Sequence, residues 1–178
     1  MRALLLAALL ALAACGATTP TAQTPRTVDR VDLSRYLGLW YEVARLPQRF
    51  QDNATLRCEA VTAEYAPLGG NRVSVVNSCV NALEPGSPPR VARGEAYVVE
   101  GSENTRLRVS FFWPFYGDYW VIGLDPDYRW AVVGAPSRRS LWVLSRTPGL
   151  PPAELERALD TARAQGFDLT ALVRAAPR

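Results

Sequence analysis

At 178 residues, with a net charge of +3 and 48% apolar residues, the sequence has the length and composition of one globular domain with a substantial core. All 20 basic residues are Arg and the chain has no His, so it cannot supply a His-based catalytic triad, a His-bound metal or haem, or a Schiff-base Lys. The positive charge is small and scattered, which argues against nucleic acid as a partner, and we expect neither a metal nor a cofactor.

The first 14 residues are typical of a secretory signal peptide. Arg2 provides a short positive region, and the apolar run from Ala3 to Ala14 is too short to cross a bilayer as a mature helix. The run ends in Leu12-Ala13-Ala14-Cys15-Gly16, which resembles the lipobox of bacterial lipoproteins, where the chain is cut before the Cys and that Cys is lipidated. The simpler alternative is an ordinary Ala-rich signal peptide with a Cys at this position by chance.

The lipobox resemblance implies that Cys15 carries a diacylglycerol thioether and an N-acyl chain such as palmitate. Each buried CH₂ contributes ~0.8 kcal/mol, so two or three chains anchor a protein stably. Residue 16 is Gly rather than the Asp that retains such lipoproteins in the inner membrane, so the resemblance points to the bacterial outer membrane. We expect residues 15–30 to be the lipidated Cys and a flexible tether, and residues 31–178 to be the folded domain.

Residues 31–37 look like one helical turn with Asp32 or Ser34 as its N-cap, leading directly into Gly38. Eight β-strands are then predicted, because β-branched and aromatic residues alternate with polar ones between turns rich in Gly, Pro and Asp. Their approximate ranges are 39–45, 58–65, 72–80, 91–100, 106–112, 119–124, 130–134 and 141–146.

One α-helix is predicted after the last strand. Pro151 and Pro152 precede its start at Ala153, and Gly166 is a suitable stop. Its apolar residues share one face: Leu155, Ala158, Leu159 and Ala162. This narrow apolar stripe favours docking on the strands over the alternative of a helix lying on a membrane surface.

Eight strands with short connections predict an all-β fold, an eight-stranded antiparallel up-and-down barrel with the C-terminal α-helix packed on it. Closure at eight strands leaves room for packed side chains or for one small ligand. Since alternate connections lie at opposite ends of such a barrel, Trp40, the turn 125–128 and Arg146 should converge at one end. There the guanidinium can stack on the Trp40 ring. The loop 46–57 and the aromatic loop 113–118 should share the other end, which we expect to be the mouth.

These motifs resemble the three signatures of the lipocalin family. The signatures comprise Gly38 and Trp40 on the first strand, Asp125, Asp127 and Tyr128 in the turn between strands six and seven, and Arg146 at the end of strand eight. The longer runs 40–45, 109–117 and 141–148 look like the bacterial lipocalins, a branch of outer-membrane lipoproteins related to animal apolipoprotein D. The resemblance covers about residues 31–173, and Pro126 in the turn is a departure that affects no functional residue.

The resemblance implies a calyx that binds a small hydrophobic ligand, a fatty acid or a lysophospholipid in this branch, for lipid storage or transport and envelope maintenance. The anchor at a lipid surface and the aromatic loop at the expected mouth agree with this function. The alternative for Trp113, Phe115 and Tyr116 is ordinary packing of a loop onto its own barrel.

Cys58 and Cys79 are expected to form a disulfide. They are equidistant from a turn at residues 67–70, so in a hairpin they should lie directly opposite one another, within bridging range. A chain with a secretory signal also folds in an oxidising compartment. The alternatives are two buried free thiols or, less favoured, a catalytic thiol.

Ligand contacts are expected along the first strand and at the mouth. If Trp40 faces inward, alternation places Glu42 and Ala44 inward as well, unless a β-bulge intervenes. For Glu42, a structural pair with an Arg or a Tyr is favoured over ligand contact, and a polar head group could pair with Arg45 or Arg49. The candidate ligand contacts are Glu42, Arg45, Phe50, Phe111, Trp113, Phe115 and Tyr116.

The leading hypothesis is therefore a non-enzymatic, lipid-binding lipoprotein. A lipid-modifying enzyme on the same barrel is a second possibility, for which a carboxylate mechanism around Glu42 is the one opening. A third is a structural envelope protein whose barrel is filled by large inward side chains. A homodimer remains compatible with the sequence.

Overall fold

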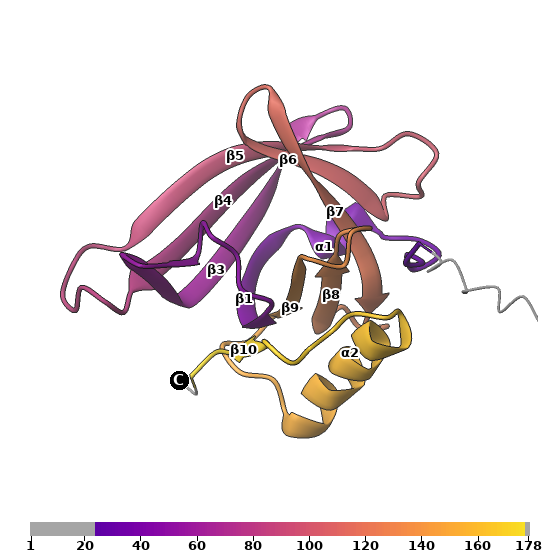
Figure 1. Cartoon of the computed structure of the whole chain (residues 1–178). Coiled ribbons are helices and arrows are strands. Elements are labelled where there is room, and N and C mark those ends of the chain that lie inside the picture. Colours follow the sequence, from indigo (N-terminus) through magenta and orange to yellow (C-terminus); the bar gives the residue numbers. More distant parts are fainter. Residues whose placement is uncertain (1–23, 177–178) are drawn as a thin grey trace, which may run out of the picture.

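The strands follow one another around a common interior, with one longer helix outside them. The computed structural model, shown in Figure 1, describes residues 24–176. Its elements, in chain order, are α1 (Leu33–Tyr36), β1 (Gly38–Arg45), β2 (Asp52–Asn53), β3 (Leu56–Gly69), β4 (Arg72–Asn81), β5 (Arg90–Val98), β6 (Arg106–Phe112), β7 (Phe115–Leu124), β8 (Trp130–Gly134), β9 (Leu141–Ser145), α2 (Pro152–Ala164) and β10 (Val173–Arg174).

The barrel is closed by β1, which pairs antiparallel with both β9 and β3. From β3 to β9, each strand pairs antiparallel with the next one in sequence. Strands β1 and β3–β9 therefore form the eight-stranded up-and-down barrel that the sequence predicts. Two short strands lie at its margins: β2 pairs with β3, and β10 pairs with Ala44 and Arg45 of β1.

Every barrel strand contributes to an apolar cluster that fills one end of the interior. Its buried members include Trp40, Val75, Val121 and Val133, whose neighbours along each strand face away from the interior. The short helix α1 closes this end from outside the barrel, with Asp32 as its N-cap. The Asp32 carboxylate accepts the backbone N–H of Ser34 at 2.9 Å, as one of the two expected capping residues should.

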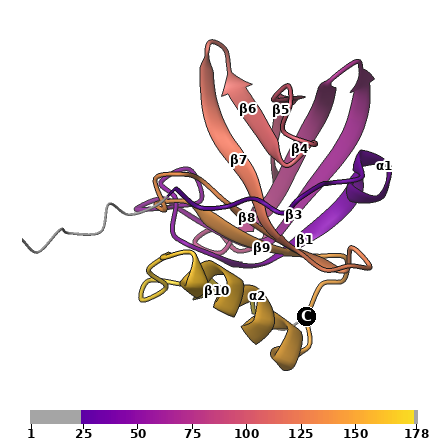
Figure 2. The same cartoon turned by 90° about the vertical axis from the view of Figure 1, so that its right-hand side faces the viewer.

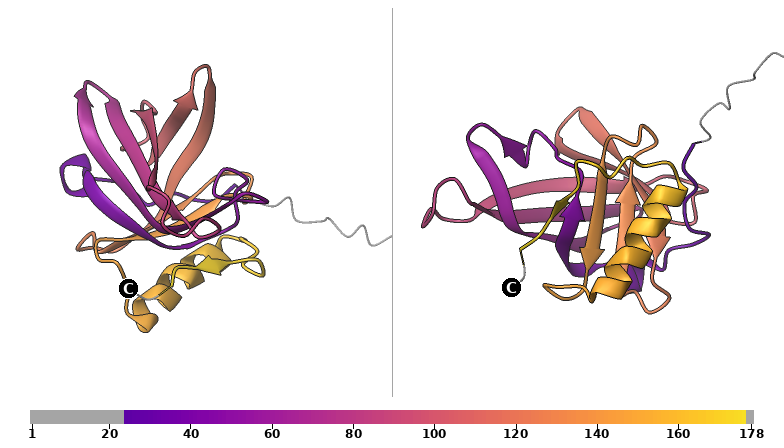
Figure 3. Two further views of the ribbon diagram at one scale, coloured as in Figure 1. Left: turned by 90° about the vertical axis from the view of Figure 1, so that its left-hand side faces the viewer. Right: turned by 60° about the horizontal axis from the view of Figure 1, so that its bottom comes forward.

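The helix α2 packs against the outer face of the barrel, as its apolar stripe predicts. Ala158, Leu159 and Ala162 are fully buried against Val132 and other residues of the strands. Figure 3 shows the helix lying across the strands on one side of the barrel. A Cβ on Gly134 of β8 would lie 2.6 Å from the ring of Phe167, which follows the helix, so only glycine permits this close approach.

Two strands differ most from their predicted limits. β7 begins at Phe115, so the expectation of a loop through Asp118 is wrong, and the turn between β6 and β7 is Trp113 and Pro114, joined by a cis peptide bond. Asp118 instead pairs with Arg108 in the ladder. β3 is longer than predicted and contains a β-bulge between Glu59 and Thr62.

The chain before α1 lies along the barrel. Residues 24–30 fall within the range assigned to the tether, yet Val28 donates its N–H to the carbonyl of Val121 at 2.9 Å. Arg26 also exchanges backbone hydrogen bonds with the Gln165 side chain. The signal peptide and Cys15 lie outside the described residues. Within residues 24–176, no helix is long and apolar enough to cross a membrane.

Candidate functional site

The closed end of the barrel is sealed by Trp40 and Arg146. The guanidinium carbon of Arg146 lies 3.7 Å from the centre of the Trp40 ring, which is fully buried. The same guanidinium donates hydrogen bonds to the carbonyl oxygens of Leu39, Tyr36 and Leu37 at 2.8–3.0 Å. Arg146 thus ties the end of β9 to α1 and β1, and the predicted convergence at this end is confirmed.

The turn between β7 and β8 supports the same end. The Asp125 carboxylate accepts the backbone N–H of Asp127 and two bonds from the guanidinium of Arg129, which hold its pKa below the ordinary value. Tyr128 has a positive φ of 61° and its hydroxyl accepts the N–H of Asp32 at 2.8 Å. The guanidinium of Arg35 stacks on the Tyr128 ring at 4.1 Å. This turn therefore holds α1 against the barrel.

Three tyrosines form the floor above this seal. The hydroxyls of Tyr36 and Tyr119 are 2.8 Å apart, and Tyr119 donates to Tyr65 at 3.1 Å. Burial raises the pKa of all three phenols, to about 12 for Tyr65. Since Tyr119 has one proton and gives it to Tyr65, Tyr36 must donate to Tyr119. The proton of Tyr65 then has no acceptor among residues 24–176.

In the closed half of the barrel, side chains fill almost all of the interior. The pocket beside the tyrosines offers only about 10 Å³ to the centre of a water molecule, which is room for one water at most. Toward the mouth the interior opens: along the inward face of β5, Val98 and Ala96 are buried, Gly94 is partly buried and Ala92 is exposed. Solvent therefore reaches the inner wall of the mouth half.

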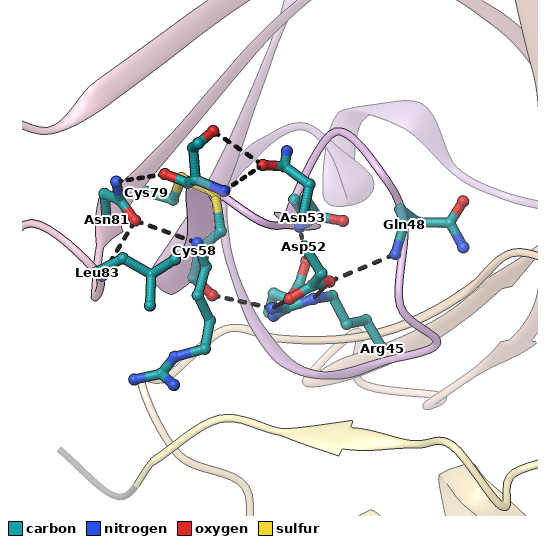
Figure 4. Close-up of a disulfide and its surroundings, with 12 residues drawn as sticks. Arg45, Gln48, Asp52, Asn53, Cys58, Cys79, Asn81 and Leu83 are labelled. Atoms are coloured by element: carbon teal, nitrogen blue, oxygen red, sulfur yellow. Dashed lines mark hydrogen bonds and ion pairs between the residues drawn. A yellow bond between two sulfur atoms is a disulfide. The ribbon is translucent and has the colours of Figure 1, made fainter.

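One wall of the mouth half contains a buried ion network. The guanidinium of Arg45 contacts a carboxylate oxygen of Glu42 at 2.7 Å and both oxygens of Asp52, and it donates to the carbonyl of Cys58 at 3.0 Å, as Figure 4 shows for Asp52 and Cys58. Gln51 donates to the second oxygen of Glu42 at 2.7 Å. Burial raises the pKa of Glu42 although Arg45 and Gln51 oppose the shift, whereas Arg45 lowers the pKa of Asp52.

A β-bulge explains why Glu42 and Arg45 meet. The pairing of β1 with β9 shifts register between Glu42 and Ala44, so Val43 and Ala44 both pack in the cluster under α2. The bulge is the exception allowed for in the alternation of this strand, and Ala44 faces outward. Arg45 donates two hydrogen bonds to Asp52, one to Glu42 and one to the carbonyl of Cys58, so most of its donors are used within the protein, in keeping with the structural role favoured for Glu42.

The disulfide between Cys58 and Cys79 is confirmed, with the Cα atoms 5.3 Å apart. Its expected register is wrong, because Cys58 pairs with Asn81 rather than directly with Cys79. The bulge in β3, where Ala60 has a φ of 52°, shifts the register and makes the bridge diagonal. The backbone carbonyl of Cys58 accepts the hydrogen bond from Arg45, so the bridged hairpin is joined directly to the ion network, as Figure 4 shows.

The aromatic candidates occupy different places. Phe111 packs against the interior cluster. Phe50, in the loop after β1, lies near Trp142 and is 63% exposed, while Trp113 and Phe115 at the β6–β7 turn are 83% and 76% exposed. Tyr116 contacts Tyr97, an exposed residue on the outer face of β5, so it is separated from the interior.

Sequence reasoning missed the polar groups of the interior. Tyr65 and Asn77 face inward beside Ala63 and Val75, and the side-chain oxygen of Asn77 is buried without a hydrogen-bond partner in the described part of the chain. Strand alternation could have placed Tyr65 and Tyr119 inward. The Asn77 position follows from the same alternation, but its missing partner is visible only in three dimensions.

Comparison with known proteins gives a consistent result. The family described as Lipocalin-like domain matches residues 31–177. Outer membrane lipoprotein Blc of Escherichia coli K12 is 38% identical over 171 residues, covering 94% of this chain and 90% of that protein. Mouse apolipoprotein D is 27% identical over 154 residues, covering 82% and 77%. The structure of insecticyanin from Manduca sexta aligns with a TM-score of 0.68 at 19% identity, covering 88% of this chain and 86% of that one.

Proposed function

The chain belongs to the lipocalin family, and we propose that it is a lipid-anchored lipoprotein of the bacterial outer membrane that binds a small hydrophobic ligand in the mouth half of its barrel. The anchor would be Cys15, in a sequence that resembles a lipobox, and the relatives named outer membrane lipoprotein support this location.

The change in exposure along β5 carries the proposal. The inward residues pass from buried Val98 to exposed Ala92, so the barrel is sealed at one end and open to solvent at the other. A cup of this form admits a ligand only from the mouth. The tyrosine floor stops it there, because almost no space lies beside Tyr36, Tyr65 and Tyr119.

The dimensions and lining favour one acyl chain, as in a fatty acid or a lysophospholipid. Along β3 the interior runs from Tyr65 to Cys58 at the rim, which is roughly 17 Å of depth at ~3.3 Å per residue and a strand tilt of ~40°. Phe111 offers an apolar contact, while the Tyr65 hydroxyl and Asn77 offer polar ones to an amphiphile. Phe50, Trp113 and Phe115 would meet the ligand at the rim.

We propose binding rather than catalysis as the activity. Glu42, the carboxylate on which an enzymatic mechanism would depend, is 5% exposed and bonded through both oxygens to Arg45 and Gln51. A general acid or base must be free to transfer a proton, and both oxygens of Glu42 already accept hydrogen bonds within the described chain.

The test fills the hollow with a side chain. A soluble form beginning at Ala17 is stripped of lipid and titrated with a fluorescent fatty acid, and lipids that co-purify with it are identified by mass spectrometry. We expect Ala92→Trp to lower the affinity at least tenfold, because the new ring occupies the inner wall. Val91→Trp places the same ring on the outer face of β5 and should bind as the unaltered chain does.

The alternative is a structural envelope protein whose barrel is filled by side chains, and the filled half of the barrel is the one observation that favours it. It predicts no saturable uptake of the probe and no stoichiometric lipid in the extract. Equal binding by the Ala92→Trp and Val91→Trp variants would contradict the proposed site in the mouth half.

A further inference from the structure

We propose that the mouth of the barrel docks directly on a lipid bilayer through an apolar rim formed by Phe50, Leu83, Phe112, Trp113 and Phe115. The inference goes beyond ligand binding, because it assigns a membrane-facing surface to the protein. For the orientation of the barrel on the bilayer, the inference depends on the lipid anchor that is part of the proposed function.

The apolar rim contains the four most exposed large apolar side chains of the described chain, together with Leu83. Phe112, Trp113 and Phe115 are 80%, 83% and 76% exposed, the highest values among the large apolar residues of 24–176. Phe50 is 63% exposed in the loop between β1 and β3, and Leu83 is 45% exposed in the loop between β4 and β5. Three of the four mouth loops thus present apolar side chains to solvent, an unfavourable arrangement unless something covers them.

The point where the chain leaves the fold lies at the same end. Arg26 is bonded to Gln165 at the end of α2, and the backbone carbonyl of Gln165 accepts a hydrogen bond from Arg138 in the loop between β8 and β9, a mouth loop. Figure 2 shows the N-terminal segment running from this side of the molecule to α1 at the opposite side. The sequence from Cys15 to Thr24 spans nine residues, which reach at most ~30 Å. A lipid on Cys15 therefore keeps the mouth, rather than the closed end, near the bilayer.

The charge around the apolar rim suits a surface of phosphate head groups. Arg49, Arg90 and Arg139 are exposed on or beside the mouth loops, and none has a carboxylate within 4.0 Å in the part of the chain that the structure describes. Against them stands one exposed carboxylate on these loops, Glu84. Aromatic side chains flanked by arginines are the residues that settle at the interface between head groups and acyl chains.

The tip of the β6–β7 hairpin gives the sharpest test. The full lipidated protein is reconstituted in vesicles of phosphatidylethanolamine and phosphatidylglycerol whose acyl chains carry bromine, and the quenching of Trp emission is compared between variants. The chain has five Trp residues, and Trp113 is the one at the tip. We expect Trp113→Ser to remove at least half of the quenching seen for the unaltered protein. Leu68→Ser, at an exposed apolar residue of the closed end, should leave the quenching unchanged.

Equal quenching in the unaltered and Trp113→Ser proteins would overturn the proposal, because the tip would then not reach the acyl chains. Sedimentation of the protein tests the alternative that a second copy of the chain covers the apolar rim. A dimer that becomes a monomer in the Phe112→Ser variant, together with unquenched Trp113 emission, would assign the apolar rim to a second copy. Fatty-acid titration of the soluble form is unaffected by either result, so failure of docking is distinguishable from failure of ligand binding.

Discussion

Arg45 is the residue on which the mouth half of β1 depends. It is 3% exposed, and its guanidinium is bonded to Glu42, Asp52 and the carbonyl of Cys58. Arg45→Met would leave the buried Glu42 carboxylate without its counter-charge, so we expect the free energy of unfolding to fall by about 3–5 kcal/mol. Urea denaturation measures the change. In the double variant Glu42→Gln/Arg45→Met only the partly exposed Asp52 loses its counter-charge, and the loss should be clearly smaller. Equal losses would show that the charge pairing is not the cause.

The tyrosine floor predicts sensitivity to alkali. Burial raises the pKa of Tyr65 to about 12, and those of Tyr36 and Tyr119 are raised as well. The folded chain thus holds these protons more tightly than the unfolded chain, whose phenols titrate near 10. Their contribution to the free energy of unfolding is complete below pH ~10 and is lost as pH rises toward 12, by about 2 kcal/mol for Tyr65.

Urea midpoints between pH 9 and 12 test this dependence. Tyr65→Phe should flatten the decline, because it removes one of the titrating groups. A decline of unchanged steepness in that variant would mean that other groups control the alkaline behaviour.

Among the elements, α1 has four residues and cannot be stable as an isolated helix. Its place depends on Arg146, which donates hydrogen bonds to four carbonyls around the junction of α1 and β1 and stacks on Trp40. We expect Arg146→Ala to lower the free energy of unfolding by about 3 kcal/mol. The same variant should shift Trp emission to longer wavelength, because water reaches the Trp40 ring.

Arg146→Lys distinguishes the contributions at this junction. An ammonium keeps the charge over the ring but lacks the planar set of donors that bonds several carbonyls, so its loss should be intermediate. A lysine variant as stable as the original would contradict the role given to the carbonyl bonds.

The same elements show what the sequence can and cannot predict. Alternation of apolar and polar residues identified all eight barrel strands. The rule that alternate connections lie at opposite ends of the barrel was enough to place Trp40 and Arg146 at the same end. The bulges escaped prediction, because Ala60 and Val43 have ordinary side chains for a strand and only the paired strands reveal the extra residue. Since each bulge reverses which side chains face inward, Ala44 faces outward, and the expected direct alignment of the two cysteines was wrong.

For the molecule as a whole, the architecture and the position of the mouth followed from the sequence, but the extent of the hollow did not. It depends on how far the rings of Tyr36, Tyr65 and Tyr119 extend into the interior, and three hydroxyls from distant parts of the chain meet there. The path of residues 24–30 along the barrel could not be predicted either, because nothing in their Thr, Pro and Arg residues indicates that Arg26 bonds to Gln165.

The short strand β10 has a consequence for self-association. β3 pairs with β1 only from Gly38 to Tyr41, and beyond that point β10 takes over the same edge at Ala44 and Arg45. An uncovered strand edge is a template for another chain, and repeated addition leads to aggregates. Two residues near the C-terminus thus cover this edge, and a chain truncated before Val173 would keep its barrel yet leave the edge free to pair with another chain.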